Sequence, residues 1–439
     1  MLRLAMPIIA AELGWVAMGV VDTMMVGRVS ETAVGAVSVG GTLFYTVAIF
    51  GTGLMLGLDT VIAQSYGAGD IKDCHKSLIN ALHLAVPLTP LLMAAVWAWI
   101  PLLRWYGINP EVLRETVPYL NALAWGIGPL LLYFVLRRYL QGMNLVQPVM
   151  FALLSANLVN AAGDWILVYG HFGAPAMGAE GAGWATTVSR LYMAAVLAGY
   201  IAWREMRDGL GLRAVSWRSD LARIRRLIEL GLPAALQIAF EVGVFAIATT
   251  MAGKLAPAAL AAHQIALTVV STTFMVAVGL SAAAAVRVGQ ALGRQDGEAA
   301  ARAGSAALVL GTAFMTCTAL AMLLLPKPIL RAYTADLQVI QAGVGLLAVG
   351  AAFQIFDGLQ AVATGALRGA GDTRTPMLCH LAAYWLIGLP LGYYLCFRRN
   401  WGITGLWDGL CVALILIGSM LLTAWRRMTA RIAEPVKAS

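Results

Sequence analysis

Two carboxylic acids lie near the middle of strongly apolar segments of this 439-residue chain. Glu241 falls within residues 226–252 and Asp357 within residues 342–366. An ionised carboxylate in an apolar setting is costly, so such a group favours a bound proton or a cationic partner. A site that holds either a proton or a cationic compound, but not both, is the minimum chemistry of exchange transport. A polar contact between helices is the alternative interpretation.

A second set of polar residues is predicted to meet at one depth in the first half of the chain. Asn160 and Asp164 are four residues apart and therefore share one helical face. At a rise of about 1.5 Å per residue, Asp22 and Thr186 lie at a similar depth in their own apolar segments. Carboxylate, amide and hydroxyl oxygens suit an alkali cation such as Na+. The alternative is a hydrogen-bond network around one protonated aspartate, which could itself carry a proton.

Each acid of the second half is accompanied by an aromatic residue. Phe245 follows Glu241 by four positions, and Phe353 precedes Asp357 by four, so each ring can share a helical face with its acid. Because ring faces attract cations, both phenylalanines are candidate substrate contacts. Ordinary core packing is the alternative for each.

The apolar segments that carry these residues are long enough to cross a membrane. The composition is 60% hydrophobic and 12% charged, with a mean hydropathy of +0.78, which excludes a soluble globule of this length. Apolar runs of about 20 residues without a period of two predict an all-α integral membrane protein and not a β-barrel. Twelve transmembrane helices are predicted, at residues 4–27, 35–60, 78–100, 117–139, 149–170, 182–203, 226–252, 259–285, 303–325, 342–366, 377–396 and 404–425.

The two halves of the chain repeat one pattern. Residues 5–70 align with residues 231–296 without a gap, at a constant offset of 226 positions. Shared positions that are not alanine include Pro7 and Pro233, Gly27 and Gly253, Gln64 and Gln290, and Asp70 and Asp296. With six predicted spans in each half, the repeat predicts two pseudo-symmetric six-helix lobes. The acids do not repeat, because Glu241 aligns with Trp15 and Asp22 with Ala248.

Basic residues mark the boundary between the lobes. We expect an N-lobe at residues 1–203, a basic linker at 204–225, a C-lobe at 226–425 and a tail at 426–439. If both termini are cytoplasmic, most of the 30 Lys and Arg residues lie on that side, as the positive-inside rule requires. The net charge of +8 therefore indicates membrane orientation, and no nucleic-acid partner is expected.

Other classes of function lack the motifs they need. The cysteines show no paired spacing, so neither a disulfide framework nor a metal knuckle is expected. The chain has no H-E-x-x-H, Walker A or nucleophile-elbow pattern. We therefore expect neither an enzyme nor a bound cofactor.

Several separated motifs resemble one family of transporters. They are GLDTVIAQSYGAGD (57–70), LQGMNLVQP (140–148), AAHQIAL (261–267), FDGLQAV (356–362) and LRGAGDTRTP (367–376). In order and spacing they resemble the multidrug and toxic compound extrusion (MATE) family. Glu241 and the FDGLQAV segment are similar to its bacterial NorM branch.

The resemblance implies a secondary active antiporter that exports lipophilic, often cationic drugs by alternating access between two lobes while Na+ or H+ enters. It implies a multi-pass protein of the bacterial inner membrane that contacts lipid, functions as a monomer and needs no cofactor besides the coupling ion. The family's functional acids match Glu241 and Asp357 in the C-lobe. Its N-lobe cation site matches Asp22, Asn160, Asp164 and Thr186. Several members carry Tyr at the position of Phe353, so a possible hydroxyl ligand for Na+ is missing here.

A lipid or oligosaccharide flippase of the same broader superfamily is the alternative function. It would share the duplicated lobes, but phosphate headgroups require a more basic cavity. Charges within the predicted spans are mainly acidic, which favours the antiporter.

Overall fold

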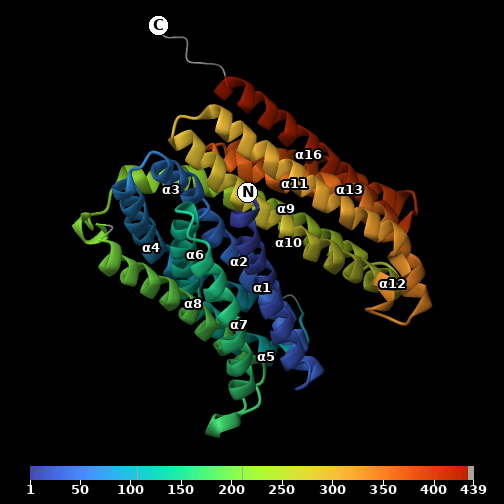
Figure 1. Cartoon of the computed structure of the whole chain (residues 1–439). Coiled ribbons are helices and arrows are strands. Elements are labelled where there is room, and N and C mark those ends of the chain that lie inside the picture. The colour runs from blue at the N-terminus through green and yellow to red at the C-terminus, as the bar shows by residue number, and fades with distance from the viewer. Residues whose placement is uncertain (106, 210, 434–439) are drawn as a thin grey trace. The chain divides into compact units, whose positions relative to one another are not determined.

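Helices build this protein, and no strand occurs among the residues that its computed structural model describes, 1–105, 107–209 and 211–433 (Figure 1). The first part of the chain forms α1 (Leu2–Val26), α2 (Glu31–Leu54), α3 (Gly57–Gly67), α4 (Ile71–Trp105), α5 (Pro110–Trp125), α6 (Ile127–Gly142), α7 (Gln147–Leu167) and α8 (Ala179–Asp208). The second part forms α9 (Leu221–Ala252), α10 (Pro257–Gly293), α11 (Gly297–Leu324), α12 (Pro326–Arg331), α13 (Leu337–Gly369), α14 (Arg374–His380), η3 (Leu381–Gly388), α15 (Leu389–Tyr393), η4 (Tyr394–Arg398) and α16 (Gly402–Ala433).

The membrane spans follow the apolar runs of the sequence. Within the described residues, eleven helical stretches are long and apolar enough to cross a membrane. The pair α5 and α6, bent by 42°, supplies a twelfth when it is counted as one span. The predicted all-α membrane protein with about twelve spans is confirmed. Of the predicted tail, α16 includes the residues up to Ala433, and residues 434–439 lie outside the described part.

Two predicted spans are less regular than their hydropathy suggested. The span expected at 35–60 is divided between α2 and α3, and the span expected at 377–396 runs from α14 to η4. In the latter, η3 and η4 are π-helical and flank α15, which contains Pro390. Proline has no backbone N–H and interrupts the regular helical ladder, which favours wider turns beside it. Hydropathy gives the length of a span but not its hydrogen-bond register.

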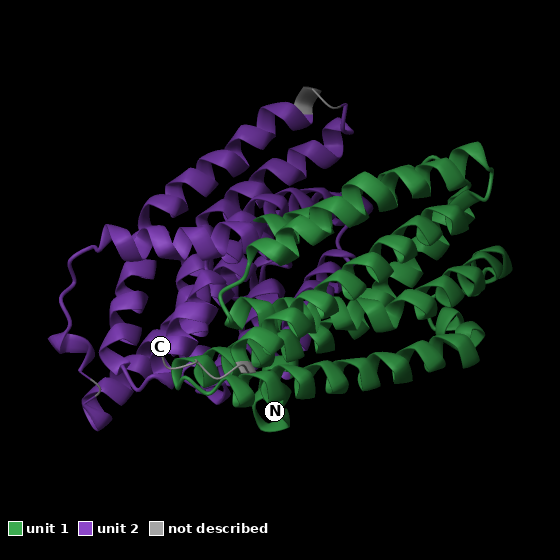
Figure 2. Ribbon diagram, turned by 90° about the horizontal axis from the view of Figure 1, so that it is seen from above, with its two compact units in different colours: residues 1–9, 236–439 green, residues 10–235 purple. Residues whose placement is uncertain are grey.

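The chain divides into two compact units, residues 10–235 and residues 1–9 together with 236–439 (Figure 2). The boundaries fall inside α1 and α9, after Ile9 and Ala235, and these positions are related by the same offset of 226 as the sequence repeat. Pro7 and Pro233 precede them by two residues. Each boundary therefore lies where a helix lacks one of its backbone hydrogen bonds.

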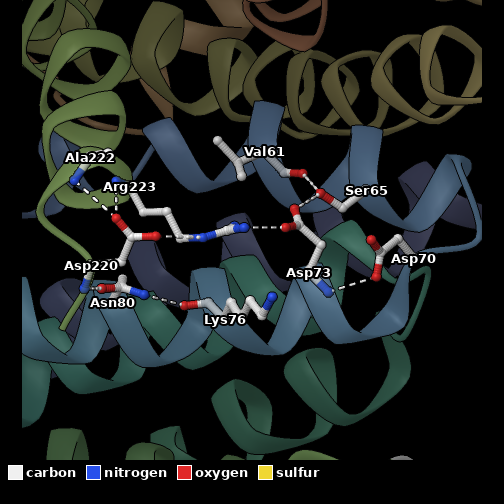
Figure 3. Close-up of polar contacts among 9 residues, drawn as sticks. All are labelled: Val61, Ser65, Asp70, Asp73, Lys76, Asn80, Asp220, Ala222 and Arg223. Carbon is white, nitrogen blue, oxygen red and sulfur yellow. Dashed lines mark hydrogen bonds and ion pairs between the residues drawn. The ribbon is translucent and has the colours of Figure 1, made fainter. Parts of the chain in front are cut away.

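A polar cluster within the unit of residues 10–235 fastens the beginning of α9 to α4 (Figure 3). The Arg223 guanidinium lies 2.5 Å from Asp73 and 3.2 Å from Asp220. The Ser65 hydroxyl donates to Asp73 at 2.6 Å, and Asn80 Oδ1 accepts from the Asp220 backbone N–H at 2.7 Å. These contacts hold the end of the basic linker against α3 and α4.

Close backbone packing joins α13 to α10 in the other unit. A Cβ added at Gly365 would lie 2.1 Å from the Ser281 carbonyl oxygen, and one at Gly369 would lie 2.3 Å from that of Ala285. The small residues are four positions apart on both helices. Such spacing lets helices approach closely in a membrane, where dispersion and weak polar contacts replace hydrophobic burial as the driving force.

Replacing Gly365 with valine is expected to destabilise this unit. The new side chain would have to displace the α10 backbone, and overpacking of this kind costs about 1–3 kcal/mol. The midpoint of thermal unfolding in detergent should fall by several degrees. Gly345→Val is the matched control, because a Cβ at Gly345 on the same helix meets nothing within 4 Å. Equal midpoints for the two variants would contradict the close contact.

Candidate functional site

The four polar residues predicted in the N-lobe come together from three helices. Asp22 of α1, Asn160 and Asp164 of α7, and Thr186 of α8 are all buried. The Asn160 side-chain amide donates to Asp22 Oδ1 and, at 3.0 Å, to Asp164 Oδ2. The Thr186 hydroxyl lies 3.1 Å from Asp22 Oδ2. One amide therefore bridges two carboxyl groups.

Asp22 and Asp164 of this N-lobe cluster also contact each other, and the cluster keeps oxygen atoms that receive no N–H or hydroxyl hydrogen bond from the described residues. Asn160 Oδ1 and Asp164 Oδ1 are buried without a hydrogen-bond partner. A buried oxygen that lacks a donor favours either a proton or a bound cation. The described residues contain no group of three or more His, Cys, Asp or Glu side chains arranged for a metal ion. The donor set here is mixed, with two carboxylates, an amide and a hydroxyl, and it fits an alkali ion or a proton.

Arg190 adds a buried positive charge to this lobe. It lies one helical turn after Thr186 on α8, and its guanidinium carbon is 4.5 Å from the centre of the Phe44 ring. Its side chain hydrogen-bonds Tyr45, and its Nε and Nη1 atoms have no hydrogen-bond partner among the described residues. Arg190 interacts electrostatically with Asp22 and therefore offsets part of the negative charge of the cluster.

The two acids of the C-lobe also share one amide. The Gln360 Nε2 atom of α13 donates to Glu241 Oε1 of α9 and to Asp357 Oδ1, at 3.2 Å each. Gln237, one turn before Glu241, donates to Glu241 Oε2 at 3.1 Å. His380, at the end of α14, places its Nε2 atom 3.7 Å from the same carboxylate oxygen. The predicted pair Glu241 and Asp357 is thus brought together, and three further residues complete the cluster.

The two phenylalanines differ in their surroundings. Phe245 has an edge-to-face contact with Tyr384, with ring centroids 6.1 Å apart. Phe353 is only 1% exposed, and its ring packs on Trp407 at 5.7 Å. The indole N–H of Trp407 donates in turn to His263. The contacts of Phe353 are those of a core residue, whereas Phe245 is partly exposed.

The sequence predicted that the charges within the spans are mainly acidic, and the structure shows that this prediction was wrong. The described spans also bury the side chains of four arginines, Arg137, Arg138, Arg190 and Arg368. Arg137 forms an ion pair with Glu12, and Arg138 lies 3.4 Å from Asp59. Both arginines fall within the span predicted at residues 117–139, where the acids offset the cost of burying their charges.

The position equivalent to Glu241 in the first copy of the repeat holds an aromatic cluster. Trp15 stacks on Tyr133 with ring centroids 6.3 Å apart, and its edge-to-face partner is Phe134 at 5.9 Å. The repeated scaffold therefore carries different chemistry at equivalent positions.

Known proteins resemble this chain over nearly its whole length. The MatE family model matches residues 7–166 and again residues 233–394. A protein of Bradyrhizobium diazoefficiens named "Probable multidrug resistance protein NorM" is 36% identical over 435 residues, which cover 98% of this chain and 93% of the relative. The crystal structure of the eukaryotic MATE transporter AtDTX14 shares the fold, with a TM-score of 0.85 and 22% identity over 99% of this chain and 97% of that one.

A third similar protein is a MOP superfamily transporter from Pyrococcus furiosus, described as having a binding pocket of reverse polarity that suggests a different function. It matches with a TM-score of 0.86 and 18% identity over 99% of this chain and 96% of that one.

The two matches of the family model begin 226 positions apart, at the offset of the internal repeat. Each half thus carries one copy of the family's characteristic segment, and the chain belongs to the MATE family, within its NorM-like branch.

Proposed function

We propose that this protein is a secondary active multidrug efflux antiporter, which exports lipophilic, often cationic compounds by alternating access between its two lobes while Na+ or H+ enters. The observation that carries the proposal is the Gln360 bridge between two carboxyl groups, that of Asp357, which is buried, and that of Glu241, which is mostly buried with 14% of its side chain exposed. The name of the NorM relative supports multidrug compounds as substrates.

The C-lobe cluster has the chemistry of exchange. Two carboxylates held by one amide repel each other when both are ionised, and burial increases the cost. A proton, a metal cation or an organic cation each relieves that cost, so they compete for the same charge. Release of one is then coupled to binding of another, as antiport requires.

The N-lobe cluster supplies a second place for the coupling ion. Its unsatisfied oxygens on Asn160 and Asp164, with Asp22 and Thr186, offer hard ligands to Na+. The same atoms can hold a proton between the two aspartates. The nearby charge of Arg190 favours a small net negative charge, which one monovalent ion neutralises.

The protein is a multi-pass membrane protein, and we place it in the bacterial inner membrane with both termini in the cytoplasm. Its bacterial relative and the basic linker between residues 204 and 225 support this orientation. Drugs, organic cations and surrounding lipid are the expected partners. The coupling ion is cargo, no other cofactor is proposed, and a monomer is sufficient for transport.

Flippase activity is disfavoured because two of the four buried arginines are already paired with acids. A headgroup phosphate needs free cationic donors, yet Arg137 and Arg138 already face Glu12 and Asp59. The fold itself does not decide the matter, because the Pyrococcus furiosus transporter shares it and is described as different in function.

Proteoliposomes with separately imposed gradients test the proposal. A fluorescent organic cation is loaded, and either a pH gradient or a Na+ gradient is applied, with protein-free liposomes as the control. We expect one gradient to drive the cation against its own gradient, which identifies the coupling ion. If neither gradient moves it, while labelled phospholipid is transferred between leaflets, the protein is a flippase.

A further inference from the structure

His380 is a fully buried histidine in the C-lobe cluster whose two ring nitrogens can be assigned from their partners. Its Nδ1 atom lies 2.7 Å from the carbonyl oxygen of Pro376. A carbonyl oxygen can only accept a hydrogen bond, so Nδ1 carries a proton. The chemical state of His380 therefore depends on its Nε2 atom alone.

Besides its contact with Glu241, His380 Nε2 has two hydrogen-bond partners, and these require opposite protonation states. Gln360 Oε1, 2.9 Å away, is an acceptor and requires a proton on Nε2. Gln237 Nε2, 3.3 Å away, is a donor and requires a free lone pair there. The first contact is satisfied when the ring is an imidazolium, and the second when it is neutral. The surroundings thus support both states of one atom.

The side-chain amide of Gln360 links that choice to the acids. In the observed arrangement its N–H groups donate to Glu241 and Asp357, which leaves its oxygen for His380. This arrangement is satisfied by two carboxylates and an imidazolium, with a net charge of −1. If the amide turns over, its oxygen accepts from protonated carboxyl groups and its N–H donates to a neutral His380. That second arrangement has no net charge.

We infer that His380 is a third proton-holding residue of this cluster, which gives its Nε2 proton to Glu241 as the Gln360 amide turns over and Asp357 takes one proton from solution. The inference rests on the proposed exchange of a proton for a cation. Every proton is accounted for: one moves from nitrogen to Glu241, and one enters. Two carboxyl groups are thus filled with a net uptake of a single proton, which matches a monovalent organic cation in charge.

The neighbours of His380 agree with such a role. Its titratable neighbours include Glu241 of α9, Tyr384, whose ring centroid is 5.7 Å away, and, through Gln360, Asp357 of α13. Helix α16 also packs against α14. The titratable groups Asp408 and Cys411 of α16 interact with each other. The π-helical segment η3 begins directly after His380, and such wide turns are frequent at functional sites.

His380→Gln tests the inference by proton counting. Glutamine keeps a polar side chain but holds no exchangeable charge, so filling both carboxyl groups then takes up two protons from solution. Binding of tetraphenylphosphonium to the protein in detergent is followed with a pH-indicator dye near the pH at which binding is half-maximal. We expect the C-lobe contribution to rise from about one to about two protons released per probe cation. Protons released by the N-lobe cluster are equal in number for the unmodified protein and for His380→Gln, so they cancel when the two counts are subtracted.

His263→Gln is the matched control. The Trp407 indole N–H, which only donates, lies 2.9 Å from His263 Nδ1, so Nδ1 carries no proton. Its Nε2 faces the Thr249 hydroxyl at 2.9 Å. These contacts satisfy a neutral ring, and the control should release as many protons as the unmodified protein.

A spectroscopic readout on the unmodified protein covers the case in which His380→Gln does not fold. The imidazole nitrogens of the five histidines are labelled with nitrogen-15. An ordinary histidine gains a proton as the pH falls. We expect one ring, with a protonated Nδ1, to change from imidazolium to neutral as the carboxyl groups take up protons.

Unchanged proton release in His380→Gln, or ordinary titration of all five histidines, would overturn the inference. The absence of any driven transport by the unmodified protein would instead overturn the proposed function.

Discussion

Glu241→Gln is expected to abolish cation-coupled efflux. The substitution preserves size and hydrogen-bonding capacity but removes the charge that Gln360 and Gln237 now hold by donating to both carboxylate oxygens. Hydrogen bonds to a charged group contribute about 1.5–3 kcal/mol, so the loss of the charge alone is expected to lower the transport rate by about 10- to 100-fold. The measurement is efflux of a fluorescent drug from membrane vesicles, normalised to the amount of protein in the membrane.

The same helix offers a matched control for this result. Glu229 of α9 is partly exposed and forms a surface pair with Arg225, so Glu229→Gln should leave transport near the unmodified rate. Asp357→Asn should resemble Glu241→Gln, because both acids bind the same amide group. Unmodified rates in both C-lobe variants would remove this cluster from the transport mechanism.

Asp22→Asn is expected to uncouple or stop transport. Asp22 accepts hydrogen bonds from both Asn160 and Thr186 through its two oxygens. An asparagine has one acceptor oxygen in place of two and no negative charge, so the cluster loses one of the two carboxylates that attract the coupling cation. We expect the drug flux driven by the coupling ion to fall about 10-fold or more. A tenfold loss corresponds to about 1.4 kcal/mol. Drug and ion fluxes are measured together in proteoliposomes.

Asp208→Asn controls for the same chemical change in the same lobe. Asp208 is partly exposed at the end of α8, where it pairs with Arg204. This substitution should leave the ratio of drug to ion flux unchanged. An unaltered ratio in Asp22→Asn as well would leave the N-lobe cluster with a structural role only.

Much of the fold could be predicted from the sequence because hydropathy and the repeat determine the number and length of the spans. The path of the chain within a span could not be predicted. The division between α2 and α3 precedes Gly57, where an added Cβ would lie 2.7 Å from the Leu227 carbonyl oxygen. Such a close approach of α9 depends on tertiary packing. The π-helical turns beside Pro390 likewise depend on neighbouring helices that hydropathy does not reveal.

The candidate site was only partly predictable. Counting helical rise grouped Asp22 with Asp164 and Thr186, because depth in a membrane can be read from one dimension of the sequence. Gln237 and Gln360 are four and three positions from the acids, so local spacing could have indicated them. His380 comes from a different helix and carries no motif, and only the folded chain shows its contact with Gln360.

The division of the chain into units has a consequence for the order in which the protein is made. Residues 10–235 form one continuous unit, so all of its parts, including Arg223 with its partner Asp73, are synthesised before residue 236. The other unit joins residues 1–9 to residues 236–439. Domains generally fold as units during synthesis. Residues 1–9 are made before either large segment, but they gain their native neighbour on α10, where Gly279 lies against Ile9, only after residues 10–235 have been synthesised.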